Sequence, residues 1–222
     1  MIPLRHSQPS YSPPFVTVII ISLNILVFLF QISLDPYERN YFIAYYGIVP
    51  DRLHYSSILT SMFLHGGWLH LIGNMWFLWI YGDNVEDVLG HAKFALFYLL
   101  CGIAAALVHI MFNPDSRLPT IGASGAIAGV MGAYLVKFPH SKIVALVPIF
   151  IFFTTFEVPA VFMLIYWFVI QIFSGVGSIG YSNVEKGGVA WFAHIGGFLA
   201  GMLLVYALGS KERFRGRRDY SW

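Results

Sequence analysis

The stretch Phe15–Ser33 reads FVTVIIISLNILVFLFQIS and contains no charged residue. A helix of this length comes close to crossing the ~30 Å hydrocarbon core of a lipid bilayer. A secretory signal peptide would have a shorter apolar region and a cleavage site of small residues, whereas Leu34-Asp35-Pro36 follows here. The stretch therefore predicts a first membrane span that is retained.

The composition of the whole chain is also that of a membrane protein. Of its 222 residues, 58% are hydrophobic and 11% are charged, against ~45–50% and ~25% in an average soluble domain. So few charges exclude both an ordinary soluble globule and a disordered chain. A net charge of only +2 argues against nucleic acid as a partner. The single cysteine, Cys101, excludes an intrachain disulfide and a cysteine-based metal site.

Further apolar stretches predict an all-α polytopic membrane protein with a bundle of six transmembrane helices. The expected spans are 15–33, 64–81, 94–112, 121–135, 158–175 and 189–208, with a polar break over 82–93. Residues 1–14 form a tail before the bundle, and residues 210–222 form a basic tail after it. The apolar region 143–184 allows either two spans, or one span preceded by a cytoplasmic segment that dips toward the membrane.

The positions of the basic residues favour one span preceded by a cytoplasmic segment in region 143–184, because Lys and Arg gather on the cytoplasmic side of membrane proteins. The C-terminal tail is rich in them and should lie inside. An additional span over 143–157 would move Lys137 and Lys142 to the outside. We therefore expect six spans with both termini in the cytoplasm, in a prokaryotic plasma membrane.

In this topology, polar side chains from three spans lie at the outer end of the bundle. They are His65, His70, Asn74, Ser124 and His194. Ionisable residues within spans are costly, so they point to function by default. Their common depth predicts one site that is open to water from the outside.

Ser124 lies between two glycines, Gly122 and Gly125. Such glycines allow a tight turn and close approach of a substrate, and free N–H groups at a helix start can stabilise an oxyanion. A serine in a span is more often a packing residue, and it becomes a nucleophile only beside a base. Ser124 is thus the candidate nucleophile if a base lies next to it.

His194 is the candidate base. Gly197 and Gly201 follow it on the same helix face and would let that face pack directly against the small-residue face around Ser124. The plainer alternative is a histidine that is hydrogen-bonded to a backbone carbonyl inside the bundle.

His70 and Asn74 are spaced i, i+4 and share a helix face, from which both can donate hydrogen bonds to an oxyanion. The alternative is a polar contact between helices. Zinc could compete for His65, His70 and His194, but the chain has no His-Glu-x-x-His motif and no carboxylate near them in the spans. We therefore expect no metal and no cofactor.

Together these motifs resemble those of the rhomboid intramembrane serine proteases, over about residues 15–210. The motifs are His65-Gly-Gly-Trp-Leu-His70-Leu-Ile-Gly-Asn74, Glu86-x-x-x-Gly90, Gly122-Ala-Ser124-Gly125 and Ala193-His194-Ile-Gly-Gly197-x-x-x-Gly201. The resemblance implies a six-helix core, a Ser–His dyad without a third acid, and cleavage of transmembrane substrates. By the same resemblance, Ser124 is the nucleophile, His194 the base, His70 and Asn74 the oxyanion side, and His65 a structural histidine.

The sequence departs from the family pattern at two points. Many members carry a Trp-Arg pair in the first loop, and residues 51–63 have none. Some members place an aromatic residue four positions after the serine, where this chain has Ala128. Something else must therefore hold His194.

The prediction that follows is an intramembrane serine endopeptidase that cleaves transmembrane-helix substrates near the outer membrane face. Its partners would be transmembrane protein substrates and membrane lipid, with no nucleic acid. Span 158–175 and the glycine-rich loop 176–188 are the expected route of substrate entry. Two alternatives are a rhomboid-like pseudoprotease that binds membrane clients without cleaving them, and a small transporter, which should show interrupted spans in repeated halves.

Overall fold

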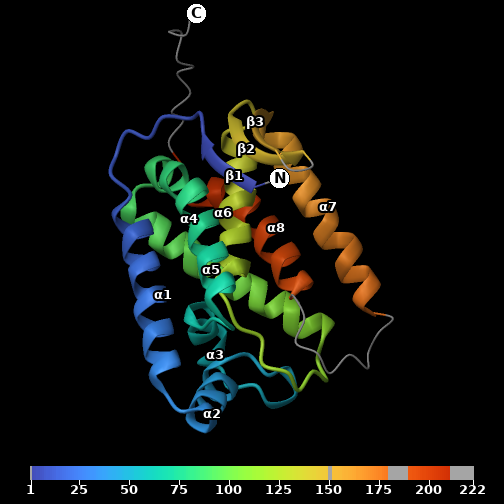
Figure 1. The fold of residues 1–222 in the computed structure, drawn as a ribbon. Helices are drawn as coiled ribbons and strands as arrows, with labels where there is room; N and C mark the ends of the chain where they lie inside the picture. The colour runs from blue at the N-terminus through green and yellow to red at the C-terminus, as the bar shows by residue number, and fades with distance from the viewer. Residues whose placement is uncertain (1, 150–151, 180–189, 211–222) are drawn as a thin grey trace, which may run out of the picture.

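A computed structural model describes residues 2–149, 152–179 and 190–210. Most of these residues are helical, and a small sheet lies at one end of the helix bundle (Figure 1). The long helices are α1 (Phe15–Ser33), α4 (Trp68–Leu89), α5 (His91–Phe112), α6 (Ser124–Lys137), α7 (Ala160–Ile179) and α8 (Trp191–Ala207). Each predicted span thus overlaps one long helix, and α7 extends four residues into the predicted loop 176–188.

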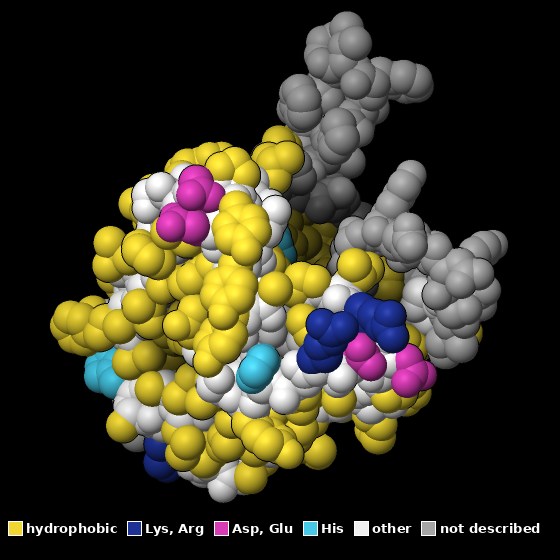
Figure 2. Space-filling view, turned by 90° about the horizontal axis from the view of Figure 1, so that it is seen from below, with side chains coloured by type: hydrophobic (Ala, Val, Ile, Leu, Met, Phe, Trp, Pro, Cys, Tyr) yellow, Lys and Arg dark blue, Asp and Glu magenta, His cyan; other side chains and the backbone are white. Residues whose placement is uncertain are grey.

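The connection between α1 and α4 contains short helices at the end of the bundle opposite the sheet (Figure 1). They are α2 (Pro36–Tyr46), η1 (Pro50–Arg52), α3 (Ser57–Thr60) and η2 (Ser61–Phe63). Seen from this end, the surface is mostly hydrophobic, and its charged side chains form a few small groups (Figure 2). Such a surface is typical of a membrane–water interface.

Length and composition allow three of the described helices to cross a membrane, namely α1, α5 and α7. The helices α6 and α8 are apolar but shorter, and α4 carries acidic residues in its last turns. The number of spans therefore stays a prediction.

Helix α4 differs from the predicted second span at both ends. It begins at Trp68, so His65 lies in the loop before it. It then continues to Leu89 through most of the polar break that we expected over 82–93. The helix can include these polar residues because several of their side chains have partners elsewhere in the chain.

Glu86, near the end of α4, binds the first turn of α1. Its buried carboxylate accepts hydrogen bonds from the backbone N–H groups of Val16 and Thr17 at 2.8 Å each, and from the Thr17 hydroxyl at 2.7 Å. The first N–H groups of a helix have no partner within the helix. Glu86 therefore caps α1 from the end of α4, which attaches the first helix to the bundle.

The all-α prediction was wrong for the end of the bundle where α6 stops and α7 begins. Strands β2 (Lys142–Ile149) and β3 (Phe152–Pro159) form an antiparallel hairpin, and β1 (Ile2–His6) pairs with β2. The segment expected to dip toward the membrane is thus mostly hairpin, and part of the N-terminal tail is a strand. Apolar β-branched and aromatic residues favour strands, and the ladder supplies partners for their backbone groups.

Side chains fasten this sheet to α4. The indole Nε1 of Trp76 donates to the carbonyl oxygen of Pro3 at 2.6 Å, and Nε2 of His6 lies 3.2 Å from Oδ1 of Asp83. Across the hairpin, Lys142 donates to Glu157 at 2.8 Å, which lowers the pKa of the Glu157 carboxyl. The N-terminal strand and the hairpin are therefore joined to each other and to the C-terminal part of α4.

Helix α6 lies at the centre of the bundle, whereas α7 lies at its edge (Figure 1). Every residue of α6 from 125 to 134 is buried, and most of these residues are small. Small side chains let the neighbouring helices approach the α6 backbone closely. The central position of α6 places its first residue, Ser124, beside α4, α5 and α8.

Candidate active site

The predicted nucleophile and base lie side by side. Ser124 is the first residue of α6, and His194 lies in the first turn of α8. The Nε2 atom of His194 is 2.7 Å from the Oγ atom of Ser124, and His194 is only 8% exposed. This is the distance at which an imidazole can take a proton from a hydroxyl group. The roles of the two residues in a reaction remain a prediction.

The opposite side of the His194 ring contacts α7. Its Nδ1 atom lies 2.7 Å from Oε1 of the buried Gln171. The indole of Trp167, one turn earlier in α7, lies 5.7 Å from the imidazole ring between centroids, at an angle of 36°. These two side chains hold His194 in place. They do so in a chain that has Ala128, and no aromatic residue, four positions after Ser124. Sequence reasoning missed Gln171, although an amide in an apolar span was a usable signal.

The turn before Ser124 depends on a glycine. Gly122 has a φ of +125°, which residues with a side chain rarely adopt. A Cβ atom there would come within 2.7 Å of Nε2 of His70 and 3.6 Å of Nδ2 of Asn74. Both polar side chains of α4 therefore face the backbone next to Ser124.

His65 holds this part of the site together from the loop before α4. Its Nε2 atom is 2.9 Å from Nδ2 of Asn74, so the Asn74 amide donates one of its two hydrogens to the ring. Gln31 of α1 binds the His65 backbone, donating to its carbonyl oxygen at 2.6 Å and accepting from its N–H at 3.2 Å. The contacts of His65 are thus those of a structural residue. Gln31 is a second amide that sequence reasoning missed.

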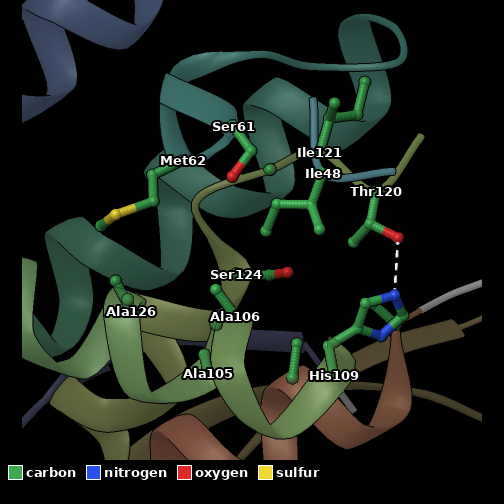
Figure 3. A pocket seen from close by; sticks show the side chains of 15 residues that line it. Ile48, Ser61, Met62, Ala105, Ala106, His109, Thr120, Ile121, Ser124 and Ala126 are labelled. Atoms are coloured by element: carbon green, nitrogen blue, oxygen red, sulfur yellow. Dashed lines mark hydrogen bonds between the residues drawn. The ribbon is translucent and has the colours of Figure 1, made fainter. Parts of the chain in front are cut away.

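A small pocket of about 30 Å³ opens beside Ser124, whose side chain projects into it (Figure 3). One water needs about 10–15 Å³ on this measure. At the far side of the pocket, Nε2 of His109 lies 2.8 Å from the hydroxyl of Thr120. Most of the remaining lining is small or apolar: Ile48, Met62, Gly102, Ala105, Ala106 and Ala193. The pocket can hold water or a small side chain next to the serine oxygen.

Comparison with known proteins identifies the family. A model of the rhomboid domain matches residues 52–211. The chain belongs to the rhomboid family. It is therefore an integral membrane protein with helices that span the bilayer. This assignment confirms the family that the motifs suggested.

Similar rhomboid proteins occur in bacteria, yeast and plants. The chain is 32% identical over 202 residues to the rhomboid protease GluP of Bacillus subtilis, covering 88% of this chain and 35% of the relative. It is 30% identical over 168 residues to RHOMBOID-like protein 6, mitochondrial, of Arabidopsis thaliana, and 30% identical over 167 residues to Rhomboid protein 1, mitochondrial, of Saccharomyces cerevisiae. Each of these two matches covers 73% of this chain, and 48% and 44% of the relative, respectively.

The chain thus spans about a third to a half of the length of these relatives. Two of the three are named as mitochondrial. The expected prokaryotic plasma membrane therefore gains no support from these rhomboid relatives.

Proposed function

We propose that this rhomboid protein is an intramembrane serine endopeptidase that cleaves transmembrane-helix substrates near the outer face of the membrane. The observation that carries the proposal is the 2.7 Å contact between Ser124 Oγ and His194 Nε2. A serine that only packed between helices would need no buried base beside it. The family match and the similarity to a bacterial rhomboid protease support the same conclusion.

The reaction begins with attack of Ser124 Oγ on the scissile carbonyl carbon while His194 Nε2 takes the hydroxyl proton. The resulting tetrahedral intermediate collapses to an acyl-enzyme, and His194 returns the proton to the leaving amine. Water then attacks the ester, again with His194 as base, and releases the new carboxyl end and free Ser124. The pocket beside Ser124 is the source of water for this second step.

Three donors surround the expected oxyanion position. The backbone N–H of Ser124 is free because it belongs to the first turn of α6. Asn74 has a second amide hydrogen that is not used on His65. The Nε2 atom of His70 can donate when its Nδ1 atom accepts from the Gly66 N–H, 3.3 Å away. Donors arranged before the reaction stabilise the developing charge without reorganisation.

The substrate must reach this site as an extended segment, because a helix hides its carbonyl groups in hydrogen bonds. His70 is exposed and Ser124 is half-buried, so the site is open on one side of the bundle. In a six-span topology with both termini in the cytoplasm, this side is the outer end of the membrane. Substrates whose helices unwind easily there, at small or helix-breaking residues, should be cleaved fastest.

The test is cleavage of a transmembrane peptide with a fluorescent reporter by the purified chain in liposomes. Wild-type protein should cleave it and react with a fluorophosphonate at Ser124. Ser124→Ala should do neither and should still fold. Ser141→Ala is the control, because Ser141 is a serine near the bundle core that lies beyond the other end of α6, away from the site. Peptide binding without cleavage by the folded wild type would favour the pseudoprotease instead.

A further inference from the structure

One buried amide connects the edge helix α7 to the candidate site. Gln171 is 4% exposed, whereas its neighbours Ile170 and Ile172 are each 38% exposed on the outer side of the helix. A polar side chain that faces inward from an apolar helix is costly unless it is hydrogen-bonded. Gln171 is hydrogen-bonded to His194, and this contact explains why the helix carries an amide here.

The second contact of Gln171 determines which way the amide points. Its Nε2 atom lies 3.3 Å from the carbonyl oxygen of Trp167, which can only accept a hydrogen bond. The amide nitrogen must therefore face Trp167, and Oε1 must face His194. Because Oε1 can only accept, the Nδ1 atom of His194 has to carry a proton.

A proton on Nδ1 leaves Nε2 of the neutral ring without one. Nε2 is the atom that lies 2.7 Å from Ser124 Oγ. The amide of Gln171 thus selects the tautomer in which His194 accepts from the serine hydroxyl. In a conventional triad an aspartate does this, and the wrong tautomer costs about 10⁴ in rate. An amide does so without burying a charge at membrane depth, which would be expensive.

We propose that Gln171 is the positioning residue of the Ser124–His194 pair and makes α7 part of the catalytic unit. The proposal rests on the proposed function, since it requires His194 to act as the base. Some family members hold the catalytic histidine with an aromatic residue at the position of Ala128. In this chain, Gln171 of α7 holds His194 instead. Trp167 contributes twice, through its carbonyl oxygen and through its ring against His194.

The test compares two variants. Gln171→Met keeps about the length of the side chain but replaces the amide oxygen by a thioether sulfur, a far weaker hydrogen-bond acceptor. Gln171→Glu keeps an oxygen acceptor. Both are measured by peptide cleavage in liposomes and by the rate of fluorophosphonate labelling of Ser124. Gln171→Met should lower kcat by about 10²-fold, within the range that general base catalysis supplies, with little change in KM. Labelling should slow in parallel. Gln171→Glu should recover at least about tenfold of this loss, because it restores the partner of Nδ1.

Ile172→Met is the matched control, since it places the same side chain one residue along on the outer face of α7, and its kcat should stay at the wild-type value. Gln171→Met within about threefold of wild type, or Gln171→Glu no faster than Gln171→Met, would overturn the proposal. If Gln171→Met does not fold, Gln171→Ser replaces it, and loss of fold in both would make Gln171 a purely structural residue. A wild type that neither cleaves nor labels would instead refute the proposed function itself.

Discussion

Gly197 of α8 lies so close to Gly125 of α6 that a Cβ atom on Gly197 would overlap the Gly125 carbonyl oxygen. The same relation repeats one turn further along, between Gly201 and Gly129. The two backbones are therefore in direct contact over two turns. Gly125 is the residue next to Ser124, and Gly197 lies three residues after His194. The contact between the two glycines therefore sets the distance between the two candidate catalytic side chains.

Gly197→Ala should separate α6 from α8 and reduce both stability and activity. The added methyl group meets backbone atoms, which cannot turn aside as a side chain can. Overpacking of this kind costs about 1–3 kcal/mol, and any widening also lengthens the contact between Ser124 and His194. Thermal unfolding in micelles and peptide cleavage measure the two effects.

The control for this change is Gly177→Ala near the end of α7, where an added Cβ has no heavy atom within 4 Å. This variant should keep the melting temperature of the wild type or a slightly higher one, because alanine favours helices more than glycine. Equal melting temperatures and rates for Gly197→Ala and wild type would show that the close contact does not matter.

Asn74→Ala should lower kcat much more than it changes KM. The amide hydrogen that faces the turn at Gly122 would bind an oxyanion, which exists only in the transition state. Loss of one such donor costs about 10²–10³ in rate, and we expect the lower end because Ser124 and His70 supply other donors. Asn40→Ala, at an exposed position in α2, is the control. A change in KM alone would point to substrate positioning instead.

Glu86→Gln should destabilise the protein without altering the chemistry of the site. The carboxylate accepts from two backbone N–H groups and the Thr17 hydroxyl, and its Oε1 atom also lies 2.6 Å from Nδ1 of His91. An amide at this position turns a donor toward some of these groups, which costs about 1–3 kcal/mol for each one left unpaired. A lower melting temperature with normal kcat at low temperature is the expected result. Glu38→Gln on exposed α2 should change neither quantity.

Activity should fall in a single step on the acidic side and stay level on the alkaline side up to about pH 8. Protonation of His194 removes the lone pair that accepts the Ser124 proton, so the charged ring is inactive. A pH–rate profile in liposomes, with and without EDTA, tests this prediction. A rate that rises toward about pH 5 would indicate an aspartyl mechanism, and loss of activity with EDTA would indicate a metal.

Cysteine labelling tests the six-span topology in a Cys101→Ala background. A cysteine at position 142, the first residue of the hairpin, should react only from the inside. A cysteine at position 115, between α5 and α6, should react only from the outside. Accessibility of both positions from the same side would refute the topology. Position 186, in the predicted loop 176–188, lies outside the described residues, as does most of the basic tail.

The sequence by itself determined the helices of the bundle and the principal side chains of the candidate site. Long apolar runs identify helices because each helix satisfies its own backbone hydrogen bonds in lipid. The spacing of glycines after His194 and around Ser124 marks the faces that touch, since only small residues permit that contact. Both signals are local in the chain, so they can be read without knowing the fold.

The tertiary structure decided what joins distant parts of the chain. The strand β1 needs β2 as its partner, and Glu86 near the end of α4 binds the first turn of α1. Likewise, no local pattern shows that Gln171 faces His194 or that Gln31 holds His65. A hydrogen-bond partner is selected by proximity in space. An amide in an apolar helix indicates that a partner is required, but the sequence does not show where that partner lies.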